Sequence, residues 1–205
     1  MDETRQMIAI AQKAPDFAAA RRHMIESQLR TSGINDAFVL ERMAEVPRED
    51  FVPEASRASA YIDRTIPLGG GAALGSPLAY GEILTHARPQ SGDTVLLIGP
   101  ATGYLAALIR PLVSEVREAT PDMLLANDVD GTFDLVIVDG ALEDVPVQLV
   151  ATLAPAGRLV TGVIRKGVTR LEVGRRSGDD LSLLAITETQ LPRLPQFDKP
   201  QGWSF

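Results

Sequence analysis

Residues 93–103 read DTVLLIGPATG, and this stretch decides the fold class. The apolar run that ends at Ile98 is bounded by turn residues, which predicts a buried parallel strand. Gly99 and Gly103 then turn the chain into a helix predicted over Tyr104–Leu112. A strand, a glycine-rich turn and a helix in this order are typical of α/β folds that bind a ligand at the turn.

Strands and helices continue to alternate downstream of this unit. We predict further strands over Glu115–Ala119, Phe133–Val138 and Arg158–Ile164, and a helix over Val145–Leu153. A Ser-Gly-Asp-Asp turn then joins two alternating segments, Thr169–Arg176 and Leu181–Glu188, as an antiparallel hairpin. The sequence therefore predicts a doubly wound, mostly parallel α/β sheet with helices on both faces and an antiparallel C-terminal hairpin.

Helices and a glycine-rich segment precede the sheet. We expect three N-terminal helices, over Thr4–Lys13, from the cap Asp16 to Leu29, and from the cap Asp36 to Val46. Their expected role is to pack over one side of the sheet. The glycine-rich segment Thr65–Pro77 is predicted to be a loop, and a helix over Leu78–Ala87 follows it.

These patterns divide the chain into three parts. Residues 1–64 form an N-terminal helical region packed on the domain, residues 65–190 a Rossmann-like domain, and residues 191–205 an extended C-terminal strap. The strap contains three aromatic residues that we expect to anchor it: Phe197, Trp203 and Phe205.

Composition excludes several classes of function. The chain has 205 residues, a net charge of −7, no cysteine and two histidines, His23 and His86. We therefore expect no metal site and no cysteine nucleophile, and the negative charge argues against a nucleic-acid partner. No apolar run reaches the roughly 18 residues that span a membrane. The N-terminus also lacks the pattern of a secretory signal, so the expected location is cytoplasmic.

Several stretches follow one another in a familiar order. The chain contains HMIESQLRTSGINDAFVLERMAEVPREDFVPE (His23–Glu54), PLGGG (Pro67–Gly71), LLIGPATGYLAAL (Leu96–Leu108), FDLVIVDGA (Phe133–Ala141) and LAPAGRLV (Leu153–Val160). Over residues 21–165 it resembles the protein-L-isoaspartate O-methyltransferase family. The resemblance implies a sheet of the S-adenosylmethionine-dependent methyltransferase type. It also implies methyl transfer from S-adenosylmethionine to the free carboxylate of isoaspartyl residues in a protein or peptide partner.

Such a reaction needs no strong general base. Carboxyl pKa values lie near 4, so the nucleophile is already ionised at neutral pH. Catalysis then consists mostly of positioning the carboxylate against an activated methyl group. The lack of a catalytic triad in this chain is therefore no objection.

The resemblance assigns cofactor binding to five residues, namely Gly99, Ala101, Gly103, Tyr104 and Glu118. Ala101 replaces the middle glycine of the family's loop, and Leu97 replaces its acidic residue. The segment is either a weakened cofactor loop or a tight turn that needs glycine for geometry alone. In the family, an acid binds the ribose hydroxyls, and Thr120 stands at its position in this sequence. Glu118 either substitutes for that acid or is a solvated charge on an edge strand.

A second loop corresponds to the family's substrate loop, and its assigned residues are Gly71, Leu74, Ser76 and Pro77. Ala73 and Gly75 stand where the family has hydroxyl groups that would hold the isoaspartyl carboxylate. Ser76 and Tyr80 are the nearby replacements. We select Ser76 and Asp139 as candidate catalytic residues. Asp139 follows a buried strand, where α/β sheets place ligands, although it is equally suited to cap the next helix.

The spacing between two predicted strands is short. Ile98 and Asp134 are 134 − 98 = 36 residues apart, whereas one strand–helix–strand crossover takes roughly 30 residues. We therefore expect one outer strand and its helix to be missing relative to the family, which leaves the Glu115–Ala119 strand at the edge. In the family the missing part contacts the adenine of the cofactor.

Two functions of different classes follow from the sequence. One is an isoaspartyl methyltransferase that uses S-adenosylmethionine. The other is a catalytically silent relative that acts as a binding or scaffolding module. A dinucleotide oxidoreductase fits poorly, because Gly99–Gly103 does not follow the G-x-G-x-x-G pattern. A homo-oligomer is compatible with the apolar anchors of the strap.

Overall fold

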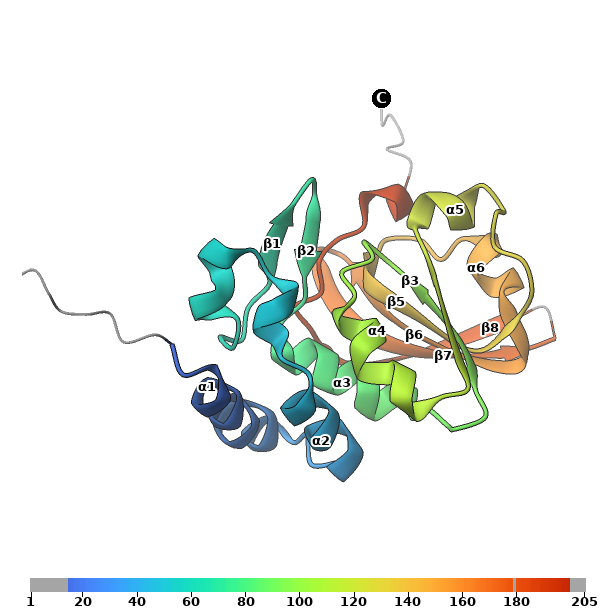
Figure 1. Ribbon diagram of the computed structural model, residues 1–205. Coiled ribbons are helices and arrows are strands. Elements are labelled where there is room, and N and C mark those ends of the chain that lie inside the picture. Colours follow the sequence, from blue (N-terminus) through green and yellow to red (C-terminus); the bar gives the residue numbers. More distant parts are fainter. Residues whose placement is uncertain (1–14, 179, 200–205) are drawn as a thin grey trace, which may run out of the picture.

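The computed structural model describes residues 15–178 and 180–199 and contains a central sheet with helices on both faces (Figure 1). Its α-helices are α1 (Phe17–Met24), α2 (Ala37–Glu45), α3 (Pro77–Ala87), α4 (Tyr104–Ile109), α5 (Pro121–Leu125) and α6 (Val147–Ala151). A π-helical turn, η1 (Ile25–Leu29), continues α1. The 3-10 turns are η2 (Arg30–Ser32), η3 (Arg48–Phe51), η4 (Glu54–Ser59), η5 (Arg110–Leu112) and η6 (Pro195–Phe197). The predicted helix Thr4–Lys13 and the anchors Trp203 and Phe205 lie outside the described residues.

Six strands form the central sheet in the order β4-β3-β5-β6-β7-β8. They are β3 (Thr94–Ile98), β4 (Glu115–Ala119), β5 (Phe133–Leu142), β6 (Leu153–Arg165), β7 (Val168–Ser177) and β8 (Asp180–Glu188). The first four run parallel, and β6, β7 and β8 pair antiparallel. The predicted fold class and C-terminal hairpin are therefore confirmed. Within the described part of the chain, β4 lies at the edge of the sheet, and only α5 and a turn separate it from β5.

Alternate residues of each central strand pack on opposite faces, which creates two apolar cores. Val95 and Leu97 of β3 belong to the core beneath α3 and α4, whereas Leu96 and Ile98 belong to the core beneath α5 and α6. The N-terminal helices join the first core indirectly. α2 packs on α3 and α4, and α3 packs on β6 and β7, so the N-terminal region forms a layer outside these two helices.

The segment predicted as the loop Thr65–Pro77 is partly a strand pair, which corrects the sequence prediction. β1 (Ile66–Gly69) and β2 (Ala72–Leu74) form an antiparallel hairpin. Gly69, Gly70 and Gly71 all have positive φ angles, between 59° and 93°, so glycine supplies a tight turn rather than an open loop.

Two further boundaries differ from the sequence prediction because of partners far along the chain. β5 extends beyond Val138 to Leu142, since Ala141 and Leu142 still pair with β6. The strap also pairs with Ala141 through two backbone hydrogen bonds, to Pro192 and from Leu194. Helix α6 is shorter than Val145–Leu153, because Leu153 already pairs with β5 as the first residue of β6. Among the described residues, no helix combines the length and apolar character that a membrane crossing requires.

Candidate active site

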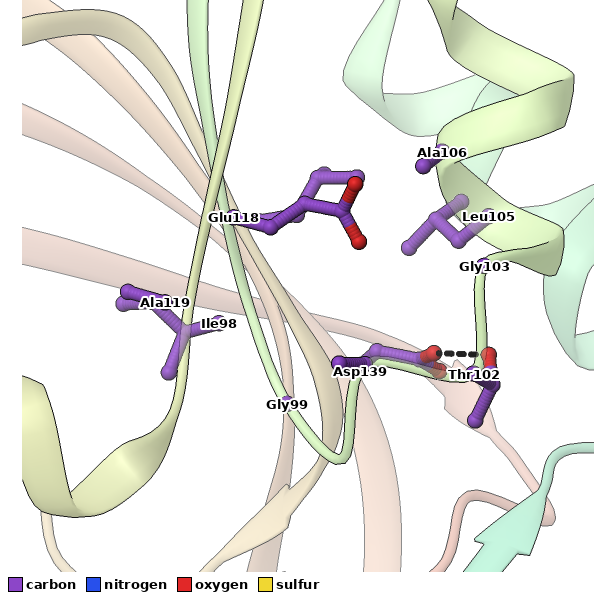
Figure 2. A pocket seen from close by; sticks show the side chains of 11 residues that line it. Ile98, Gly99, Thr102, Gly103, Leu105, Ala106, Glu118, Ala119 and Asp139 are labelled. Carbon is purple, nitrogen blue, oxygen red and sulfur yellow. Dashed lines mark hydrogen bonds between the residues drawn. The ribbon is translucent and has the colours of Figure 1, made fainter.

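A cavity lies at the carboxyl ends of β3, β4 and β5 (Figure 2). It has a volume of about 20 Å³ and collects four of the five residues assigned to the cofactor, together with the candidate catalytic acid: Gly99, Ala101, Gly103, Glu118 and Asp139. Thr102, which the sequence analysis did not select, lines the same cavity. Ligands bind at this end of open α/β sheets, so the position fits a binding site.

The turn between β3 and α4 keeps a left-handed backbone although one glycine is replaced. Ala101 has a φ angle of 51° and Gly103 one of 78°. Gly99 has a different reason to be glycine, since a Cβ atom there would lie 2.9 Å from Cβ of Asp139. The turn therefore preserves its geometry, and Gly99 allows the close approach of Asp139.

Asp139 is the most deeply buried acid of the cavity, with 5% of its surface exposed. The Tyr80 hydroxyl donates a hydrogen bond to its Oδ1 at 2.9 Å, and the Thr102 hydroxyl donates to its Oδ2 at 3.4 Å. Burial raises the pKa of Asp139 to about 6, against the lowering effect of the two hydroxyl donors. Asp139 lies inside β5 and Pro146 occupies the N-cap position of α6, so Asp139 is not a helix cap.

Glu118 lies on β4 with its carboxylate between that strand and helix α4 (Figure 2). Arg110 donates to it at 3.0 Å, and both side chains are partly exposed. Thr120, at the position aligned with the family's ribose acid, instead caps α5 by accepting a hydrogen bond from the Met123 amide. Glu118 is therefore the acid of β4 that faces the cavity.

The two candidate catalytic residues do not meet. Ser76 is 2% exposed, and its hydroxyl accepts a hydrogen bond from the Ala79 amide as the cap of α3. It borders a different hollow, together with Asp63, Glu82 and Glu188. Pro77 is the first residue of α3. Ser76 and Asp139 therefore border different spaces.

Tyr80 connects the substrate loop to the cavity instead. Its hydroxyl accepts a hydrogen bond from the Gly75 amide at 3.2 Å and donates to Asp139. The carbonyl of Gly75 accepts from the guanidinium of Arg48, which lies over the rings of Tyr80 and Tyr104 at 5.5 Å and 5.0 Å. Tyr104, assigned to the cofactor by the sequence, is fully buried in this stack and does not line the cavity.

Neither Arg48 nor Thr102 was selected from the sequence. Arg48 follows a proline and precedes two acids, a pattern typical of solvated surface, yet it is fully buried. Thr102 lies within the glycine loop, and its position between Ala101 and Gly103 is the signal that could have identified it. Leu74, assigned to the substrate loop, is a buried core residue of β2.

A second hollow, of about 430 Å³, meets the cavity at Gly99. Gly71 of the β1–β2 hairpin, Thr120, Asp122 and the strap residue Arg193 line it. Arg193 forms ion pairs with Glu143 at 2.9 Å and Asp198 at 2.8 Å and remains half-exposed. The cavity alone, at about 20 Å³, lies far below the roughly 300–1,000 Å³ that ligand pockets occupy, so a cofactor-sized ligand also needs part of the second hollow.

Comparison with known proteins points to one family. Residues 19–120 match the family model of protein-L-isoaspartate(D-aspartate) O-methyltransferase. The chain is 34% identical over 194 residues to the protein-L-isoaspartate O-methyltransferase of Methylorubrum extorquens, which covers 82% of this chain and 85% of that protein. A Roseiflexus sp. protein of the same name is 35% identical over 191 residues, with 81% and 87% covered.

Solved structures agree on the fold. A protein-L-isoaspartate O-methyltransferase from Plasmodium falciparum, in complex with S-adenosyl-L-homocysteine, superimposes with a TM-score of 0.68 at 17% identity and covers 89% of this chain and 99% of that chain. A further structure described as protein-L-isoaspartate O-methyltransferase has a TM-score of 0.66, also at 17% identity, with 85% and 65% covered.

Proposed function

The chain belongs to the protein-L-isoaspartate O-methyltransferase family, and from this premise we propose that it transfers the methyl group of S-adenosylmethionine to the free carboxylate of isoaspartyl residues. One observation supports this function above the others. The cavity at the carboxyl ends of β3, β4 and β5 gathers the glycine turn and two carboxylates. Oxygen acceptors of this kind suit the hydroxyl groups and the positive sulfur of that cofactor.

The proposed cofactor site consists of the Gly99–Gly103 turn, Glu118 and Asp139. S-Adenosylmethionine supplies the activated methyl group when it is bound. The protein then has to hold the two reactants in line and exclude water. We assign Glu118 to the cofactor's hydroxyl groups, because it is the acid of β4 that lines the cavity.

We assign the substrate carboxylate to the second hollow. Arg193 is the basic residue among the described residues that line this space. A guanidinium has five donors, so Arg193 can keep contacts with Glu143 and Asp198 and still donate to a carboxylate. Arg193→Gln should raise the KM for an isoaspartyl peptide by a larger factor than it weakens the binding of S-adenosylmethionine.

A catalytically silent binding module is the second candidate, and the state of the substrate loop favours it. Both backbone groups of Gly75 are already occupied, by Tyr80 and Arg48, and the Ser76 hydroxyl caps α3. The loop therefore offers no free hydroxyl at these two positions. The predicted cytoplasmic location and homo-oligomer stay predictions under either function.

Two measurements separate these functions. The first is calorimetric titration of the protein with S-adenosylmethionine and with its demethylated product. The second is transfer of a labelled methyl group to an isoaspartyl peptide, with the matching aspartyl peptide as control. Binding with transfer to the isoaspartyl peptide alone supports the enzyme. Folded protein that gives no heat with either ligand refutes it and supports the silent module.

A further inference from the structure

Among the described residues, no cationic side chain contacts the carboxylate of Asp139. Of the residues that line the cavity, Glu118 and Asp139 are the charged ones, and both are acids. Glu118 is paired with Arg110 at 3.0 Å, at a partly exposed position. The groups that contact the Asp139 carboxylate are two neutral hydroxyls, those of Tyr80 and Thr102.

The nearest source of positive charge does not contact Asp139. Arg48 acts on it through space, and the guanidinium lies over the Tyr80 ring. The hydrogen bonds of Arg48 go to the backbone carbonyls of Ala60 and Gly75. Removing a carboxylate from water without a paired cation is costly, so Asp139 has capacity for a positive partner from the cavity side.

The side chain is also fixed in place. Tyr80 is fully buried, and its hydroxyl is held by the Gly75 amide before it reaches Asp139. The backbone of Gly99 packs against Asp139 so closely that a Cβ atom there would clash. A charge held this rigidly reorients little when the charge of a ligand changes, so it can distinguish ligands that differ in charge.

We propose that Asp139 selects the ligand of this cavity by charge, favouring the sulfonium form of the cofactor over its demethylated product. This inference rests on the proposed function. In the transfer, the bond between methyl carbon and sulfur breaks and its electron pair stays on sulfur. The substrate carboxylate gains the methyl group and becomes a neutral ester. The sulfonium becomes a neutral thioether, so Asp139 loses its counter-charge and the product is released more readily.

The expected size of the effect follows from ordinary charge interactions. An opposite charge within about 4–6 Å shifts an ionisation equilibrium by roughly one to three powers of ten. We take the lower end, because the two hydroxyl donors already stabilise part of the negative charge. The preference of the wild-type protein for S-adenosylmethionine over the demethylated product should therefore fall by about tenfold when the charge of Asp139 is removed.

The test compares dissociation constants for S-adenosylmethionine and S-adenosylhomocysteine, measured by calorimetry at pH 8. Asp139→Asn should weaken the binding of S-adenosylmethionine about tenfold. The same variant should bind S-adenosylhomocysteine as tightly as the wild type does, or more tightly. Glu118→Gln is the matched control, since it also removes one negative charge from the cavity. Glu118 is assigned to hydroxyl groups that both ligands share, so this variant should weaken both by the same factor.

A second measurement needs no substitution. Burial raises the pKa of Asp139 to about 6, so the wild-type preference for the sulfonium ligand should decline between pH 8 and pH 5. Equal weakening of both ligands in Asp139→Asn, or a wild-type preference that is constant over this pH range, overturns the inference alone. Folded wild-type protein that binds neither ligand overturns the proposed function and this inference together.

Discussion

Replacing Ala101 with glycine tests whether the altered cofactor loop is strained. Ala101 has a φ angle of 51°, in the left-handed region, and it is exposed at the lining of the cavity. A left-handed conformation costs a residue other than glycine roughly 1–2 kcal/mol. Glycine loses more conformational freedom on folding than alanine does, and this entropy loss costs about 0.5–1 kcal/mol.

The difference between the midpoints of these two ranges leaves a net stabilisation of about 0.7 kcal/mol for Ala101→Gly. For a domain of this size, that corresponds to a rise in Tm of about 1–4 °C. The substitution also removes a methyl group from the cavity lining, so affinity for S-adenosylmethionine should increase. Calorimetric unfolding measures the first change and ligand titration the second.

Ala156→Gly is the matched control. Ala156 is also exposed, has a φ angle of 63°, and lies where the pairing of β6 with β5 shifts register, outside the cavity. It should give a similar rise in Tm without a change in ligand affinity. If Ala101→Gly lowers the Tm while Ala156→Gly raises it, the assignment of strain to this loop is wrong. Equal ligand affinities in the two variants would show that the Ala101 methyl group does not limit binding.

Three further predictions concern the groups that hold the site together. Burial raises the pKa of Asp139 to about 6 in the folded protein, above its ordinary 3.8. Between these two pH values, the carboxyl group is therefore protonated in the folded state and mostly ionised in the unfolded state. Wild-type stability should therefore fall by about 2 kcal/mol relative to Asp139→Asn as the pH rises from 4 to 7, as measured by urea unfolding. Arg48→Met leaves two buried carbonyls without donors and should destabilise the protein by about 3 kcal/mol, whereas Arg30→Met, at an exposed pair, should cost less than about 0.5 kcal/mol. Gly140→Ala places a Cβ atom 2.5 Å from Leu194 and should cost about 1–3 kcal/mol, and its cost should shrink in a Leu194→Ala background if the clash is the cause.

The strands of the sheet were predictable because their signal is local. β3 and the start of β5 are apolar runs bounded by turn residues, and the structure places strands there. The short interval after Ile98 also indicated that β4 lies at an edge, which agrees with the strand order. Phe197 is buried against the second core, as expected for an anchor of the strap.

The parts of the site that could not be predicted depend on contacts between distant segments. Arg48 is buried because carbonyls of Ala60 and Gly75 accept its donors, and no local pattern encodes such acceptors. Asp139 lies within a strand rather than at its end, because Ala141 and Leu142 continue the pairing of β5 with β6. The hairpin at residues 66–74 was missed because glycine content alone does not distinguish a tight turn from an open loop.

One hydrogen-bonded chain connects the substrate loop to the cavity. The Gly75 amide donates to the Tyr80 hydroxyl at 3.2 Å, and this buried hydroxyl then needs an acceptor for its own hydrogen. Asp139 supplies that acceptor at 2.9 Å. The Gly75 amide and the buried carboxylate of Asp139 are therefore two ends of the same hydrogen-bonded chain, and a change at either end alters the other.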